Sequence, residues 1–161
     1  MSESPVRSEI LDTGNPKIKS ARILINSPAK EIFDFLANPH RHKDFDGTKT
    51  IQENISGPDR LELGSKFGMQ MRLGINYKIH NTVVEFEENR KIAWRHFGRW
   101  RWIYELKPIS PTQTEVTETF DGTTSISQLW LKVRKAYPWT QIAVAKSLVR
   151  LKALVESANG S

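Results

Sequence analysis

The chain of 161 residues contains no cysteine, and this absence excludes disulfide bonds, thiolate metal sites and cysteine nucleophiles together. It also lacks any apolar run close to the roughly 18 residues that a membrane-spanning helix needs. Residues 1–16 are polar where a secretory signal would be apolar, so we expect a cytoplasmic location. A chain of this length suits one domain, which buries about two thirds of its unfolded surface.

Acidic residues are missing from Gly122 to Val155, although the whole chain has 18 Asp and Glu against 24 Lys and Arg. The basic residues of this stretch are Lys132, Arg134, Lys135, Lys146, Arg150 and Lys152. Such a segment is either a solvated helix face or a contact with an anionic surface or ligand. We expect no nucleic-acid partner but a weak contact with anionic membranes, through Lys132, Lys135, Lys146 and Arg150. The oligomeric state stays open.

The first part of the chain predicts a tail, a strand and a helix. Residues 1–16 mix serine, proline, glycine and charge without a sustained period, which predicts a flexible tail. Alternation over residues 18–25 predicts a strand, and Ser27 and Pro28 then suit the N-cap and first position of a helix. This helix should end at Asn38, because the residue before a proline disfavours helical geometry.

Turn signals recur between residues 46 and 121 and separate six candidate strands. Helical spacing returns after Asp121, where the residues expected on the buried side are Val144, Leu148, Leu151 and Val155. The order of strand, helix, six strands and long helix predicts an α+β fold with an antiparallel sheet. We expect one ligand-binding domain over residues 17–157 and a short C-terminal tail at 158–161.

The segment at residues 92–104 predicts a β-hairpin whose register follows from side-chain alternation. A two-residue turn would place Trp94 and Arg101 on one face, whereas a three-residue loop at 97–99 separates aromatic from charged side chains. The longer loop pairs His96 with Trp100, Trp94 with Trp102, and Ile92 with Tyr104. One face of the hairpin is therefore expected to be almost entirely aromatic.

The other face of this hairpin is expected to be basic. It carries Arg95 directly opposite Arg101, with Lys91, Arg99 and Lys107 nearby. Like charges in opposed positions are mildly destabilising. Either solvent screens these charges or an anionic surface uses them.

Glu118 is the polar exception on the inner face of the predicted sheet. It alternates with Val116 and Phe120, so it should point inward beside Tyr104. An unpaired buried carboxylate costs several kcal/mol, so Glu118 must meet His96, Tyr104, water or a ligand, or stay protonated. The inward aromatic residues either line a cavity or simply fill the core against the C-terminal helix.

Neither a metal nor a cofactor is expected. His40, His42, Asp44 and Asp46 fall close together but lack the spacing of a metal-ligand motif. The glycines at 64 and 68 flank Ser65 and Lys66 without the spacing, or the following helix, of a phosphate-binding loop.

Several segments together resemble the START-related helix-grip superfamily (SRPBCC), specifically its bacterial polyketide cyclase/dehydrase and lipid-transport type. The resemblance lies in ILINSPAKEIF at 23–33, LANPHRH at 36–42, FDG at 45–47, KIAW at 91–94, TEVTETFD at 114–121 and the closing helix at 148–155. It covers about residues 17–157. It implies a curved seven-stranded antiparallel sheet wrapped around a long C-terminal helix, with short helices after the first strand and a ligand cavity between sheet and helix.

We favour a non-catalytic protein that binds a lipid, a polyketide or another aromatic or apolar metabolite in this cavity. The expected ligand-binding residues are Phe67, Met69, Met71, Tyr77, Trp94, His96, Trp100, Trp102, Tyr104, Glu118, Phe120, Trp130 and Leu148. The alternative is an aromatase/cyclase or dehydratase acting on a polyketide-like substrate. In that case His96 or Glu118 is the candidate general base and Tyr104 stabilises the enolate. A third hypothesis is a membrane-surface or partner-docking module that uses the basic C-terminal helix.

Overall fold

A computed structural model of the chain describes residues 8–45, 51–73, 75–95, 100–123 and 136–159. Of residues 51–56, 69–73, 75–79, 136–139 and 159 it describes the backbone only. The strands are β1 (Glu9–Leu11), β2 (Ile18–Ile25), β3 (Ile51–Ser56), β4 (Lys66–Leu73), β5 (Ile75–Glu87), β6 (Lys91–Arg95), β7 (Arg101–Ser110) and β8 (Gln113–Asp121). The helices are α1 (Ala29–Leu36), the 3-10 turn η1 (Pro39–Arg41), α2 (His42–Phe45) and α4 (Ala136–Asn159).

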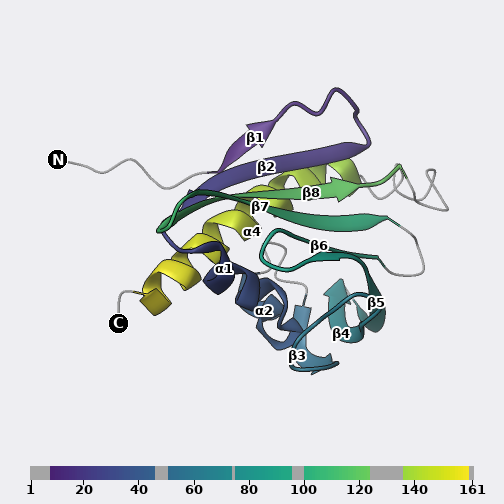
Figure 1. The fold of residues 1–161 in the computed structure, drawn as a ribbon. Coiled ribbons are helices and arrows are strands. Elements are labelled where there is room, and N and C mark those ends of the chain that lie inside the picture. The colour runs from purple at the N-terminus through teal and green to yellow at the C-terminus, as the bar shows by residue number, and fades with distance from the viewer. Residues whose placement is uncertain (1–7, 46–50, 74, 96–99, 124–135, 160–161) are drawn as a thin grey trace.

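The strands form one antiparallel sheet in the order β1-β2-β8-β7-β6-β5-β4-β3. Its curvature is visible in Figure 1, where β3 to β5 bend away from the flatter part formed by β2, β8 and β7. The seven expected strands are β2 to β8, and β1 adds an eighth at the edge of the sheet. The predicted α+β fold, with short helices after the strand at 18–25, is confirmed.

The structure differs from the expected flexible tail at residues 9–11, which form β1. Glu9 pairs in register with Arg22 of β2, and the two side chains make an ion pair of 2.7 Å. The Ser8 hydroxyl also donates a hydrogen bond of 2.8 Å to the carbonyl of Ala145 in α4. A strand of three residues is too short to show a hydrophobic period, so composition alone suggested a tail.

The boundaries of α1 follow from its flanking residues. Pro28, rather than the expected Ser27, occupies the N-cap position, and the Ser27 hydroxyl instead lies 3.2 Å from the Glu31 carboxylate. The helix ends at Leu36, before the Asn38–Pro39 pair as predicted. The Asn38 side chain then accepts a hydrogen bond of 3.0 Å from the backbone N–H of His40 and starts η1.

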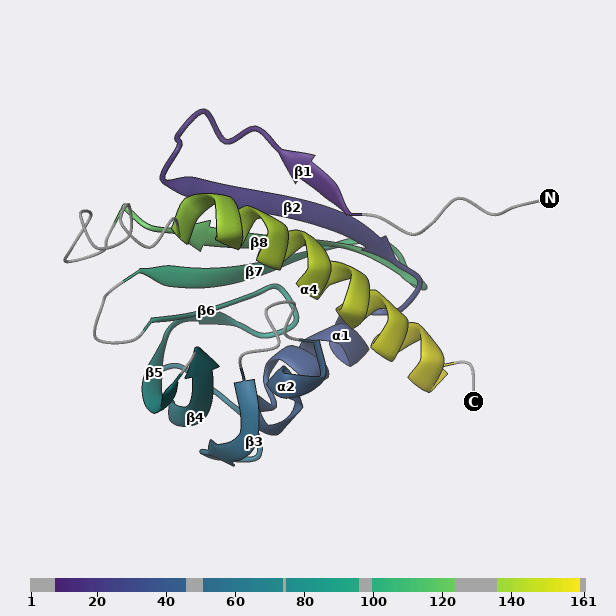
Figure 2. The same ribbon diagram turned by 180° about the vertical axis from the view of Figure 1, so that it is seen from behind.

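Helix α4 lies across one face of the sheet, over β2 and β8, and we call this the inner face (Figure 2). Its predicted buried side is confirmed, because Val144, Leu148, Leu151 and Val155 are fully buried. Helix α1 adds Ile32, Phe33 and Leu36 to the same core, and these residues recur at helical spacing on one face. None of the helices in the described ranges is long and apolar enough to cross a membrane.

Candidate functional site

The hairpin of β6 and β7 has the register that the alternation predicted. Ile92 pairs with Tyr104, and Trp94 pairs with Trp102. Residues 96–99 lie outside the described part of the chain, so the pairing of His96 with Trp100 stays a prediction. The next strand continues the inner face, since β8 places Glu118 opposite Tyr104 and Phe120 opposite Trp102.

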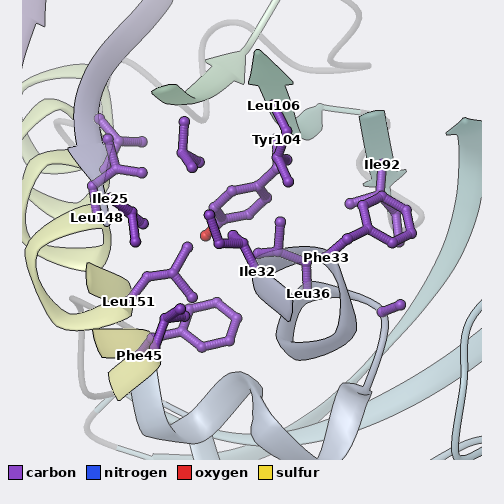
Figure 3. Close-up of a cluster of buried hydrophobic side chains, with 14 of the residues drawn as sticks. Ile25, Ile32, Phe33, Leu36, Phe45, Ile92, Tyr104, Leu106, Leu148 and Leu151 are labelled. Carbon is purple, nitrogen blue, oxygen red and sulfur yellow. The ribbon is translucent and has the colours of Figure 1, made fainter. Parts of the chain in front are cut away.

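Tyr104 and Glu118 form a polar pair inside the core, as the sequence predicted. Glu118 is 2% exposed and Tyr104 is 3% exposed. The Tyr104 hydroxyl donates a hydrogen bond to Oε1 of Glu118. Figure 3 shows Tyr104 within a buried cluster that includes Ile32 of α1 and Leu151 of α4. Of the partners expected for the carboxyl group, the structure therefore supplies the Tyr104 hydroxyl.

His42 joins the aromatic side chains around this pair. Its ring stacks on Trp94 with centroids 4.8 Å apart, and Trp94 in turn lies 5.6 Å from the Tyr104 ring. His42 is 2% exposed, and its Nε2 lies 2.8 Å from the carbonyl oxygen of Leu36. Because a carbonyl oxygen only accepts, Nε2 carries the proton in this contact.

Sequence reasoning considered His42 only as a possible metal ligand and missed its inward position. The signal was present in the Asn38–Pro39 pair, which starts a new helical turn at η1. Continuing that turn places His42 and Phe45 three residues apart on one side of α2, and both are buried. Within the described ranges, no three His, Asp or Glu side chains come together to hold a metal ion.

The other predicted ligand-binding residues fall into four groups. Phe67, Trp94, Phe120 and Leu148 are buried in the core. Trp100 and Trp102 are partly buried and pack against it, with the Trp102 and Phe120 ring centroids 4.9 Å apart. The side chains of Met69, Met71 and Tyr77 lie outside the description, although Met71 and Tyr77 are register partners on β4 and β5. Trp130 lies outside the described residues.

The inner face has an aromatic half and an aliphatic half. The aromatic half consists of Phe67, Trp94, Trp102, Tyr104 and Phe120, together with Glu118 and His42. The aliphatic half consists of Ile23, Ile25, Leu106 and Val116. In the described part of the chain the aromatic rings contact one another directly, so the expected open cavity stays a prediction.

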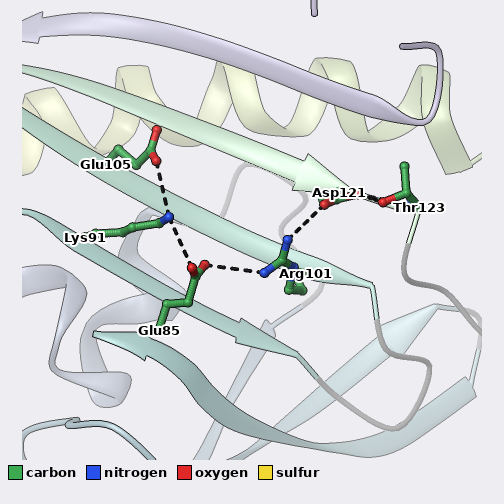
Figure 4. A network of polar contacts seen from close by, with 6 residues as sticks. All are labelled: Glu85, Lys91, Arg101, Glu105, Asp121 and Thr123. Atoms are coloured by element: carbon green, nitrogen blue, oxygen red, sulfur yellow. Dashed lines mark hydrogen bonds and ion pairs between the residues drawn. The ribbon is translucent and has the colours of Figure 1, made fainter. Parts of the chain in front are cut away.

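The outer face corrects the expectation that Arg101 is left to solvent or to an external anion. Arg95 and Arg101 are register partners as predicted, but Arg101 lies between two carboxylates of the same sheet. Its guanidinium is 3.5 Å from Glu85 and 3.1 Å from Asp121, as Figure 4 shows. Lys91 also lies between two carboxylates, 3.2 Å from Glu85 and 3.6 Å from Glu105.

Asp121 has a perturbed acidity at the end of this network. Burial raises the pKa of its carboxyl group, but hydrogen bonds from the hydroxyl and backbone N–H of Thr123 and from Arg101 outweigh burial. The pKa of Asp121 is therefore lowered from its ordinary value. The charges of Lys91 and Arg101 are compensated within the sheet, so the aromatic half of the inner face is the better candidate site.

Comparison with known proteins gives relatives and a fold. No family model matches the chain. The uncharacterized protein Rv0088 of Mycobacterium tuberculosis is 39% identical over 113 residues, which is 70% of this chain and 50% of that protein. A second protein of the same species, MT0096, is 38% identical over the same length. The chain thus spans about half the length of the curated relatives it matches.

Several solved structures share the architecture at low sequence identity. Protein NE0264 from Nitrosomonas europaea has a TM-score of 0.65 and 15% identity, over 94% of this chain and 100% of that chain. The Polyketide_cyc-like protein Cgl2372 from Corynebacterium glutamicum has a TM-score of 0.61 and 17% identity, over 88% and 93%. The Aha1 protein of Colwellia psychrerythraea, solved as a dimer, has a TM-score of 0.52 and 17% identity, over 81% and 95%. The chain therefore has the helix-grip α+β fold that its sequence predicts.

Proposed function

We propose that this protein binds a hydrophobic small molecule between the aromatic half of the sheet and α4. The observation that carries the proposal is the buried pair of Tyr104 and Glu118. A core that only has to pack gains nothing from a carboxyl group, because burying one costs several kcal/mol unless it is well paired. An apolar interior with a few convergent polar groups is typical of a small-molecule site.

The exposure of the tryptophans supports an approach to this site from the first residues of β7. Trp100 and Trp102 are partly exposed, whereas Trp94 is 6% exposed. The aromatic surface thus continues from the buried Tyr104 to the outside along one row of side chains. The likeness to a Polyketide_cyc-like protein agrees with a lipid, a polyketide or another aromatic metabolite as ligand.

Ligand titration tests the proposal. We expect tryptophan fluorescence and thermal stability to change with at least one probe among dodecanoate, decan-1-ol, phosphatidylcholine, cholesterol and 1-naphthol. Trp102→Ala should weaken binding by about tenfold, because it removes a large ring from the aromatic half. The control is Ile103→Ala, which truncates the next residue of β7 on the outer face and should leave the dissociation constant unchanged. A chain that no probe stabilises, or equal effects of both variants, would contradict the proposal.

A second candidate is an aromatase/cyclase or dehydratase acting on a polyketide-like substrate. The same pair favours it, because a carboxylate beside a tyrosine hydroxyl joins a potential general base to a hydrogen-bond donor. His96, the other candidate base, lies outside the described residues. Glu118→Gln should abolish turnover of a substrate while leaving its affinity within about threefold if chemistry occurs here. Parallel loss of both would leave binding as the function.

Contact with anionic membranes is a third candidate, favoured by one face of α4. Ile142 is 57% exposed, and Lys146 is exposed four residues later on the same side of the helix. Arg150 follows, while Lys132 and Lys135 lie outside the described residues. Co-sedimentation with vesicles containing phosphatidylserine at low salt, lost with neutral vesicles, would support this contact. Absence of binding at low salt would exclude it.

A further inference from the structure

The immediate surroundings of Glu118 have a simple chemistry. Across the sheet it is paired with Tyr104 on β7 and Ala21 on β2, and along β8 its inner-face neighbours are Val116 and Phe120. All of these side chains are at most 3% exposed. Among the four neighbours only Tyr104 can form a hydrogen bond, and it donates to Glu118. Of these five described side chains, those of Glu118 and Tyr104 are the polar ones.

We infer that Glu118 makes the site selective for apolar ligands that carry a hydroxyl donor, and against ligands that carry a free carboxylate. The inference deepens the proposed function and rests on it. An ionised carboxylate only accepts, but its two oxygens have about four lone-pair sites, so a ligand hydroxyl can share it with Tyr104. A ligand carboxylate at the same place would bring two like charges together in a poorly solvated interior, which disfavours binding.

Lys19 offers an alternative binding position for a ligand carboxylate, away from Glu118. It is the register partner of Phe120 and lies on the inner face, two residues along β2 from Ala21. Lys19 is only half-buried and lines a hollow at the surface, formed with residues 11–16, Ile18 and Gln141. A carboxylate held there by Lys19 would not approach Glu118, and an acid would then bind as well as an alcohol.

The test compares ligands that differ only in their polar group. Dissociation constants of decan-1-ol and decanoate, and of 1-naphthol and 1-naphthoate, are measured by tryptophan fluorescence at pH 7.5. In the wild type we expect each alcohol to bind at least about tenfold more tightly than its acid. Glu118→Gln should bring the two within about threefold, because an amide carries no charge and can donate to the acid. Glu118→Met is the second variant should the first fail to fold, and it should also lose the preference.

The matched control is Glu115→Gln, which removes the same charge from the same strand on its outer face. It should keep the wild-type preference. Equal affinity of alcohol and acid for the wild type overturns the selectivity while leaving the proposed function intact, and so does a preference that survives both Glu118 variants. If none of the four probes binds the wild type but phosphatidylcholine or cholesterol does, this inference fails and the proposed function stands; if no probe of either set binds, both fail.

Discussion

The Tyr104 hydroxyl donates a hydrogen bond to the carboxyl group of Glu118 across β7 and β8, and both side chains are almost completely buried. Tyr104→Phe keeps the ring and removes only this donor. Because the acceptor stays buried, we expect the free energy of unfolding to fall by about 1–3 kcal/mol. Urea denaturation followed by circular dichroism measures the change.

A double-mutant cycle separates this hydrogen bond from other effects of the two substitutions. Once Glu118→Gln has replaced the charged acceptor, Tyr104→Phe should cost less than it does in the wild type. Residues in direct contact show coupling energies of about 0.5–3 kcal/mol. A coupling near zero would mean that the two side chains contribute independently to stability.

The sequence was sufficient to place Glu118 inward beside Tyr104, although it left the partner of the carboxyl group open, because each step depended on alternation alone. Side-chain alternation in the hairpin puts Trp94 and Trp102 on one face, and alternation in β8 then places Glu118 inward. When the side-chain direction is known for one strand, the register fixes it for the neighbouring strand wherever no β-bulge lies between them. The described residues of β6, β7 and β8 up to Leu106 and Val116 contain no such interruption.

Other features could not be predicted, because tertiary contacts decide them. The register of β5 against β6 shifts between Val83 and Glu85, and Glu85 lies within reach of both Lys91 and Arg101. The alternation of polar and apolar residues in the sequence does not predict such a shift. The stacking of His42 on Trp94 likewise depends on how α2 packs against the sheet, although the buried side of α2 itself could be predicted from the sequence.

His42 should stabilise the end of α1. Its Nε2 donates to the carbonyl oxygen of Leu36, one of the last carbonyls of that helix, which have no partner within the helix itself. His42→Phe preserves a ring against Trp94 but leaves this carbonyl unsatisfied, so we expect a loss of about 1–3 kcal/mol in urea denaturation. His42→Gln, which retains a donor, should recover part of the loss.

The control for His42 is His80→Phe, because His80 is exposed on β5. This substitution should change stability by less than about 0.5 kcal/mol. A His42→Phe variant as stable as the wild type would show that the contact with Leu36 contributes nothing.

Gly57 and Gly64 have positive φ angles of 142° and 84°, but their surroundings differ. A Cβ atom at Gly57 would lie 2.8 Å from Cβ of the buried Phe67, whereas nothing lies within 4 Å of a Cβ at Gly64. Gly64→Ala should therefore lower the free energy of unfolding only by the cost of a left-handed backbone conformation in alanine, about 1–2 kcal/mol. Gly57→Ala adds a displacement of Phe67, which contacts Trp94, so its cost should be larger by at least about 1 kcal/mol. Equal costs in thermal or urea denaturation would contradict the close approach.

Asp121 should make the free energy of unfolding depend on pH. Because hydrogen bonds from Thr123 and Arg101 hold the pKa of the folded state below that of the unfolded chain, the folded state favours the ionised carboxylate. The resulting stabilisation is fully present above the unfolded pKa, about 4, and is lost as the pH falls through the lower folded pKa.

Asp121→Asn tests this dependence directly. The difference in unfolding free energy between wild type and variant should be largest near neutral pH and should shrink below about pH 4, where the carboxylate becomes protonated first in the unfolded chain and, at lower pH, in the folded state. Glu9→Gln is the control, since the pKa of Glu9 is also lowered by its hydrogen bond with Arg22, but that ion pair is exposed and screened by solvent. The unfolding free energy of this variant should depend on pH in the same way as that of the wild type. A constant difference for Asp121→Asn between pH 3 and pH 7 would show that Asp121 acts through packing, because only an ionisable contribution changes with proton concentration.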